Sequence, residues 1–278
     1  MAHPQVAAFA RLANGNANPE RRIEGQKTLL ARTMHSIEYD AIHDEITLPV
    51  PGGGAVLTFR GGATGEEAPI RVIQGPLTQI TNPSRLGIDP VNNEIYVPQG
   101  GRILVFPREA NGNVAPTRVV GGSGSRLDAG AVAIDPIHNL LIVVGSAGDK
   151  RSQIQIFDRL ASGNAKPKSV IAGPHTNLWS TGGPFTINAA TGKILVPIRG
   201  AISTQLTFAP DSFVGIWSIN DNGDVPPQFT LGGPNGAFQM IRGIAVNPKH
   251  KEVIVTDKRL NAVLTFSVPE IFEQRATQ

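Results

Sequence analysis

Cysteine is absent from this sequence of 278 residues, and aromatic residues make up only 5% of it. A chain without cysteine has no disulfide, no thiolate metal site and no cysteine nucleophile. This composition suits the cytoplasm and also a bacterial envelope in which disulfides are optional. Because Met1–Gln5 can follow a removed signal peptide, a secreted or periplasmic protein is slightly favoured over a cytoplasmic one.

Long apolar runs are also missing. No stretch approaches the roughly 18 consecutive apolar residues of a membrane-spanning helix, and no apolar signal segment follows Met1. The formal net charge is +3, without blocks of like charge and without aromatic residues interleaved among basic ones. We therefore expect no membrane span and no nucleic-acid partner.

Glycine, with 31 residues, and proline, with 22, are plentiful, and apolar residues reach 40%. This profile is typical of many short strands joined by turns around a hydrophobic core. An apolar segment ending in an aromatic residue recurs with a period of about 50 residues, which indicates a propeller or a solenoid. The copies end at Phe9, Phe59, Phe106, Phe157, Trp217 and Phe266.

A glycine turn, a proline and a short strand follow each of the first five copies. Asn-Gly and related turns tolerate positive φ and favour hairpins, and proline at the start of a strand suits an outer edge. The turn glycines are Gly15, Gly65, Gly112, Gly163 and Gly223, and the short strands end at Ile23, Ile73, Val120, Ile171 and Leu231.

Two further strands complete each repeat. The first ends in a carboxylate or an amide, and the second is apolar nearly throughout, as expected when neighbouring sheets cover both of its faces. We name the four strands a, b, c and d from the inside outward, which is the blade of a β-propeller. The inner a strands end at Asp40, Asp89, Asp135, Asn188 and Asn247.

Five inner pairs predict an all-β, five-bladed β-propeller of four-stranded antiparallel blades that spans residues 1–278 as a single domain. A six-bladed ring is the alternative, although it needs an inner pair that we do not find. Because the chain starts and stops inside a repeat, we expect the N-terminal strand near Pro19–Ile23 to close the ring by completing the last blade. The sequence does not decide whether the c strand at Phe9 or the one at Phe266 is surplus.

The motif GIAVDP..NEIYV....ILVF...A.GN..P.R.I.G covers nearly the whole chain. It resembles NHL-type repeats and the related propellers of the streptogramin lyases and gluconolactonases. The resemblance implies a propeller that acts as an enzyme, an interaction platform or a binder of sugars or peptides. In the two enzyme families it implies a metal ion in the axial channel, held by carboxylate, amide and histidine side chains. This chain has no full match to either metal set.

The two faces of such a propeller differ. The a–b and c–d turns share one face, which we call the repetitive face, and the b–c and d–a loops share the other, the irregular face, where we expect function. Three histidines lie in a–b turns on separate blades, too far apart to share an ion, so we expect turn residues rather than a metal site. These turn histidines are His43, His138 and His250.

Four other side chains are candidates on the irregular face. His35 precedes the first inner strand, and His175 and Trp179 share a d–a loop. Glu38 is a carboxylate at an inner position where the other blades have Gly, Ala or Thr, so it must be paired, solvated or bound to a cation. Glu38 and His35 are the candidate ligands for a divalent ion such as Ca²⁺ or Mg²⁺ on the axis. Structural ion pairing of Glu38 is the alternative.

Basic residues also gather on this face. Arg85 and Arg242 stand just before inner strands of separate blades, and b–c loops add more. A mildly basic mouth would concentrate carboxylates, sulfates or phosphates, whereas a solvated surface is the alternative. The longest loop, residues 197–213, is expected to form a wall, a lid or a partner contact.

Two functional hypotheses follow. The first is a non-catalytic binding or interaction module for an anionic small molecule, a glycan or a peptide. The second is a metal-assisted lyase or lactonase-type hydrolase that acts at the axial channel through Glu38 and His35. No G-x-S-x-G elbow, H-E-x-x-H helix or paired-carboxylate segment supports another hydrolase. The predicted ligand-binding residues are His35, Glu38, Arg85, His175, Trp179 and Arg242.

Overall fold

The computed structural model describes residues 4–122, 127–146, 151–179, 183–199, 211–234 and 236–273. Within these ranges the regular structure is β, with short 3₁₀-helices and no α-helix. None of the helices in these ranges has the length and apolar character needed to cross a membrane.

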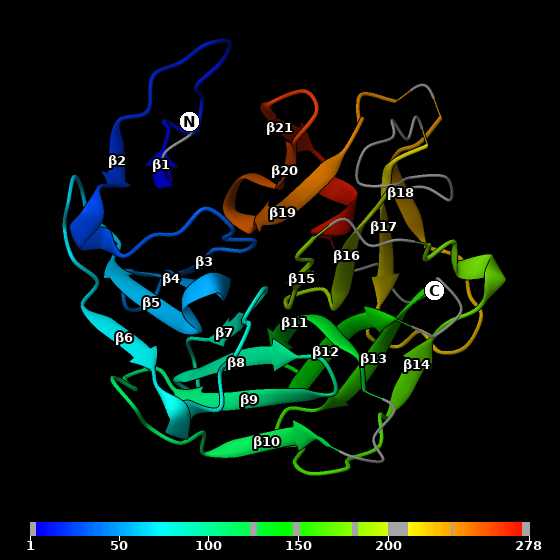
Figure 1. The fold of residues 1–278 in the computed structure, drawn as a ribbon. Helices are drawn as coiled ribbons and strands as arrows, with labels where there is room; N and C mark the ends of the chain where they lie inside the picture. Colours follow the sequence, from blue (N-terminus) through cyan, green and yellow to red (C-terminus); the bar gives the residue numbers. More distant parts are fainter. Residues whose placement is uncertain are drawn as a thin grey trace. The chain divides into compact units, whose positions relative to one another are not determined.

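Antiparallel sheets of three or four strands form five blades, which confirms the predicted all-β, five-bladed propeller (Figure 1). Blade 1 consists of β3 (Glu38–Asp40), β4 (Glu45–Val50), β5 (Ala55–Arg60) and β6 (Arg71–Gln74). Blade 2 consists of β7 (Gly87–Asp89), β8 (Glu94–Gln99), β9 (Arg102–Pro107) and β10 (Arg118–Gly121). Blade 3 consists of β11 (Ala129–Asp135), β12 (Leu140–Ser146), β13 (Ser152–Asp158) and β14 (Ser169–Ile171). Blade 4 consists of β15 (Thr186–Asn188), β16 (Lys193–Ile198), β17 (Phe213–Ser218) and β18 (Phe229–Gly232).

Blade 5 has three strands in the described residues, β19 (Ile241–Asn247), β20 (Glu252–Asp257) and β21 (Ala262–Ser267). At the other end of the chain, β1 (Gln5–Ala8) and β2 (Arg21–Glu24) pair with each other as a separate hairpin. Short 3₁₀-helices are η1 (Gln26–Thr28), η2 (Pro51–Gly53), η3 (Pro76–Thr78), η4 (Pro174–Thr176), η5 (Pro248–His250) and η6 (Pro269–Ile271).

The middle strands of each blade carry the core. In β4 every residue is buried, as the near-continuous apolar sequence of a strand covered on both faces predicts. Leu48, Leu57 and Phe59 of blade 1 pack with Ile23 of the N-terminal hairpin in one cluster. In blades 3 and 4, apolar side chains from the b and c strands form a second cluster around Trp217.

The chain divides into two compact units, residues 1–99 with 104–118 and residues 100–103 with 119–278. We refer to them as unit 1 and unit 2 and describe each by itself. The single domain over residues 1–278 and the closure of the ring by the N-terminal strand concern the relation between the units, and both stay predictions.

The glycine turns have a role beyond the hairpin. In unit 1, Gly112 of the c–d turn of blade 2 forms a parallel bridge with Ile73 of β6, the outer strand of blade 1. The flanking Asn111 and Asn113 accept hydrogen bonds from backbone N–H groups of blade 1, at 2.9 and 2.7 Å. The same bridge joins Ile23 to Gly65 in unit 1, and Val120 to Gly163 and Ile171 to Gly223 in unit 2. In these four cases the turn glycine therefore pairs with the outer strand that precedes it along the chain.

Candidate functional site

One repeat position, five residues before the end of each inner strand, lies at the irregular face. It is occupied by His35, Ser84, Gly130, Gly183 and Arg242. In unit 1, His35 Nδ1 lies 3.0 Å from Ser84 Oγ, so this position touches its equivalent on the adjacent blade. In unit 2, a Cβ on Gly183 would lie 1.9 Å from the Arg242 carbonyl oxygen. In these two pairs, the position on one inner strand therefore lies close to its equivalent on the next inner strand of the same unit.

The following repeat position, four residues before the end of the inner strand, also links adjacent blades in unit 1. Ser36 is buried, and its Oγ accepts a hydrogen bond from the Leu86 N–H at 3.2 Å. Arg85 occupies the same repeat position as Ser36 on the neighbouring blade and is half-buried. Arg85 precedes β7 as expected, whereas Arg242 lies inside β19 and not before it as the sequence predicted. The two arginines also differ by one repeat position, because Arg242 aligns with Ser84.

Glu38 is half-buried in β3, opposite Thr47 of β4. Within the described residues its carboxyl group makes no ion pair and no hydrogen bond, so the structural ion pair considered from the sequence is not found there. Burial raises the pKa of Glu38 from its ordinary value of 4.5 to about 8. At neutral pH the side chain is therefore mainly a neutral acid that can donate a hydrogen bond.

Arg242 stands out in unit 2. It is the extra residue of a β-bulge in β19, between Ile241 and Gly243, both of which pair with β20. The side chain is half-buried, and its buried Nε donates no hydrogen bond. Among the described residues, its guanidinium has no ion pair. The inner strand of blade 3 has the same bulge with Gly130 as its extra residue, so the bulge does not require arginine.

His175 belongs to a blade junction. Its backbone N–H donates to Asp224 Oδ1 at 2.7 Å, and its Nδ1 lies 2.6 Å from Asp224 Oδ2. Asp224 follows the turn glycine Gly223, so the pair repeats the contact that Asn113 makes in unit 1. Partial loss of water raises the pKa of Asp224, but the hydrogen bonds from His175 outweigh this and hold it below its usual value. A role of His175 in ligand binding stays a prediction.

Trp179 lies beyond His175 in the same d–a loop and is half-buried. The guanidinium carbon of Arg151, at the start of the c strand of blade 3, lies 4.9 Å from the centre of a Trp179 ring, a cation–π contact. Ser152 holds the loop against this strand, because its Oγ donates to the Trp179 carbonyl at 3.1 Å. The pair forms a cationic and aromatic surface on the irregular face of unit 2.

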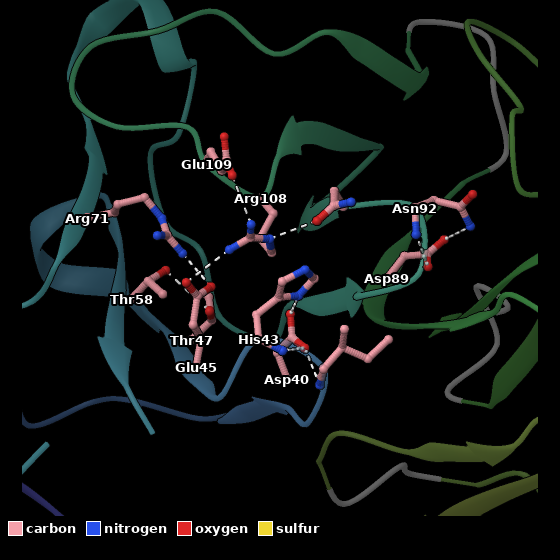
Figure 2. A network of polar contacts seen from close by, with 12 residues as sticks. Asp40, His43, Glu45, Thr47, Thr58, Arg71, Asp89, Asn92, Arg108 and Glu109 are labelled. Carbon is pink, nitrogen blue, oxygen red and sulfur yellow. Dashed lines mark hydrogen bonds and ion pairs between the residues drawn. The ribbon is translucent and has the colours of Figure 1, made fainter. Parts of the chain in front are cut away.

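The repetitive face contains polar side chains that satisfy one another (Figure 2). Asp40 accepts N–H bonds from Ile42 and His43 at 2.9 Å, and its other oxygen lies 2.7 Å from His43 Nδ1. Glu45 of β4 pairs with Arg71 and, at 2.9 Å, with Arg108.

The other turn histidines follow or vary this pattern. In unit 2, His138 pairs with Asp135 at 2.7 Å in the same way as His43 with Asp40. His250 is exposed in η5, and Asn247 of its turn binds Glu252 instead, at 3.0 Å. These contacts support a turn role for the first two histidines, and the lack of a shared metal stays a prediction.

Metal ligation has no support in the part of the chain that the structure describes, where no group of three or more His, Asp and Glu side chains is arranged to hold an ion. His35 Nδ1 is engaged with Ser84. The predicted wall loop is described only at its ends, Pro197–Arg199 and Asp211–Phe213, and its residues 200–210 lie outside the described ranges. Asp149 and Lys150, two charged residues expected in the b–c loop of blade 3, also lie outside these ranges.

Sequence reasoning missed the residues that fasten the d–a loops. Thr28, Thr78 and Thr176 are fully buried, and each donates its hydroxyl to the glycine carbonyl three residues before it, at 2.6 to 2.7 Å. The signal was present as the recurring pattern G-[PQ]-x-T after three outer strands. The role of the residue after each turn glycine was likewise not predicted.

Comparisons with known proteins agree with the fold. No model of a known family matches the chain, and no curated protein matches it. Among solved structures it is similar to the β-propeller domain of Cps50 (Swd1) from Myceliophteria thermophila, with 12% identity and a TM-score of 0.56 over 89% of this chain and 68% of that one. It is also similar to Kuenenia stuttgartiensis hydrazine synthase, with 10% identity and a TM-score of 0.55 over 89% of this chain and 59% of that one. A chain of a mitotic checkpoint complex shares 14% identity and a TM-score of 0.56, over 90% of this chain and 65% of that one.

At this level of identity the similarity shows the fold alone, and the chain spans less than two thirds of two of these relatives. The protein is therefore a β-propeller, a fold that commonly serves as an interaction module. The comparisons do not identify an NHL-type, streptogramin lyase or gluconolactonase family, so that part of the resemblance stays a prediction.

Proposed function

We propose that this protein is a non-catalytic binding module whose ligand site lies on the irregular face, where the inner strands begin. The ligand is an anionic small molecule, a glycan or a peptide that carries negative charge. The observation that supports this is a difference in how charged side chains are paired. Carboxylates of the repetitive face, such as Asp40 and Glu45, bind neighbouring groups, whereas Glu38 and Arg242 have no ion pair among the described residues.

The charges at the irregular face favour an anion. A half-buried guanidinium without a counterion has lost part of its hydration, and a bound anion restores that interaction. Glu38, in unit 1, adds little negative charge at neutral pH because burial raises its pKa to about 8. Both features favour negatively charged ligands over cations.

The remaining predicted residues take supporting roles in this proposal. His35 and Arg85 provide donors in unit 1, and Trp179 provides an aromatic surface in unit 2. His175 is the weakest member of the set, because its backbone N–H and Nδ1 are both engaged with Asp224. The alternative, a metal-assisted lyase or lactonase, gains no specific support from the described residues.

A ligand screen tests the proposal. Anionic small molecules, glycans and peptides are screened by thermal shift, and hits are measured by isothermal titration calorimetry. We expect Arg85→Ala or Arg242→Ala to weaken an anionic ligand by about 1 to 3 kcal/mol, the usual scale for a hydrogen bond to a charged group.

Arg60→Ala is the control, because Arg60 is exposed, ends β5 towards the repetitive face and pairs with Glu67 at 2.8 Å. Equal weakening by the control, or a ligand bound at the a–b turns, would contradict the proposed site. Turnover that requires added Ca²⁺ or Mg²⁺ and is lost in Glu38→Gln would favour the lyase or lactonase instead.

A further inference from the structure

The bulge in β19 contains an arginine, Arg242, at a position where the equivalent bulge of blade 3 has a glycine. Blades 3 and 5 both begin their inner strands with the same irregularity, one extra residue between two ladder pairs. Bulges re-aim a side chain and are frequent beside functional sites. Blade 3 places Gly130 there and blade 5 places Arg242, so the local backbone is compatible with a residue that has no side chain.

The carboxylate nearest along the ladder does not neutralise Arg242. Asp257 lies at the end of β20, opposite Ile241. Its Oδ2 accepts the Gln239 and Met240 N–H groups at 2.7 and 2.8 Å, and its Oδ1 accepts two more backbone N–H groups at 2.9 and 3.1 Å. Burial raises the pKa of Asp257, but these four bonds outweigh it and lower the pKa overall. Both carboxylate oxygens of Asp257 therefore accept hydrogen bonds from the backbone.

The surroundings of Arg242 in unit 2 provide little side-chain cover. The neighbouring blade brings Gly183 to the same repeat position, in such close approach that a Cβ would overlap the Arg242 carbonyl. β16 packs against β19, with Leu195 and Ile241 in one cluster, and the buried Arg199 follows directly after β16. Two arginines thus stand at the irregular ends of adjacent blades.

We infer that the Arg242 guanidinium, set in its bulge, is the anchor for a single oxyanion group of the ligand, a carboxylate or a phosphate. This inference rests on the proposed binding function and deepens it. A guanidinium presents parallel N–H donors that match the two oxygens of either group, which an ammonium does not reproduce. The bulge sets the direction of the Arg242 side chain. Because Asp257 binds backbone N–H groups, the guanidinium is available to a ligand.

The test uses inorganic phosphate and acetate as separate probes of the full chain, with binding followed by NMR titration at low ionic strength. Arg242→Gly copies the natural bulge of blade 3, so we expect it to remain folded and to bind the preferred probe about tenfold more weakly or worse. Arg242→Lys keeps the charge without the fork and is expected to bind with intermediate affinity. Arg60→Ala, which removes one exposed charge elsewhere, is expected to stay within about twofold of the parent protein.

The preferred probe identifies the anion, since tighter phosphate binding indicates a phosphorylated ligand and tighter acetate binding a carboxylate. Equal weakening by Arg242→Gly and Arg60→Ala, or no saturable binding of either probe, would overturn the inference. If Arg242→Gly does not fold, Arg242→Gln takes its place with the same expected loss. A glycan or peptide from the screen that binds the irregular face and is insensitive to Arg242→Gly would overturn the oxyanion anchor while leaving the binding function intact.

Discussion

Replacing Glu38 by glutamine is expected to stabilise the protein at neutral and alkaline pH. Burial raises the pKa of this carboxyl from 4.5 to about 8. Below pH 4.5 the folded and unfolded chains are both protonated at Glu38, so the residue has no effect on the pH dependence of stability. Between pH 4.5 and about 8 the unfolded chain loses this proton while the folded protein keeps it, so the free energy of unfolding falls as pH rises.

The size of the effect follows from the two pKa values. At about 1.4 kcal/mol per pH unit, the interval from 4.5 to 7 corresponds to about 3 kcal/mol at pH 7, which is an upper limit for a half-buried group. The glutamine side chain has nearly the same shape and does not titrate. The stability gained by Glu38→Gln should therefore be near zero at pH 4, grow through neutrality and level off above pH 8.

Urea denaturation at pH values from 4 to 9 measures this difference in the free energy of unfolding. Glu20→Gln, at an exposed position of unit 1, is the matched control and is expected to follow the parent protein at every pH. A Glu38→Gln variant whose stability runs parallel to that of the parent protein across the range would refute the reasoning.

Three further predictions concern the fold. Removing residues 1–25 should lower the melting temperature sharply, because it deletes β2 and the buried side chain of Ile23, a loss of about 2 to 5 kcal/mol by itself; an unchanged melting temperature would contradict this. Gly75→Ala should lower the free energy of unfolding by about 1 to 3 kcal/mol, because Gly75 has a φ of 125° and an added Cβ would lie 2.6 Å from the Asn113 side chain. Thermal melts measure the effect, and Gly62→Ala is the control because a Cβ on Gly62 would meet no atom within 4 Å. Replacing the three turn histidines by alanine should leave fold and metal content unchanged, as judged by circular dichroism and elemental analysis, and loss of a stoichiometric ion would show that their placement is wrong.

Most of the fold was predictable because the same sequence pattern of strands and turns recurs in each blade. Alternation between apolar strands and glycine turns predicted the strand order within a blade, and counting inner pairs predicted five blades. The contacts between blades were harder to predict. The residue after a turn glycine reads locally as part of a hairpin, yet Asn113 and Asp224 bind backbone groups of the preceding blade, about 36 to 49 residues away in sequence.

The candidate site was predictable in part for the same reason. Glu38 and Arg242 were found because they depart from small or apolar residues in the repeat. That Glu38 lacks an ion pair among the described residues, and that Arg242 occupies a bulge, depends on strand register and on neighbours in other blades. His175 looked equally irregular, but its partner Asp224 is distant in sequence, and a single sequence does not reveal such a pairing.

The pentapeptide AVLTF, which occurs at 55–59 and again at 262–266, separates what the sequence determined from what the tertiary structure decided. Both copies form the c strand of a blade, in β5 and β21, because local apolar patterning and β-branched residues favour an extended chain wherever they occur. Val56 is 1% exposed, whereas its counterpart Val263 is 60% exposed. β5 pairs with the outer strand β6, and β21 has no outer strand in the described residues. Strand formation follows from neighbours along the chain, but burial depends on segments that only the folded structure brings alongside.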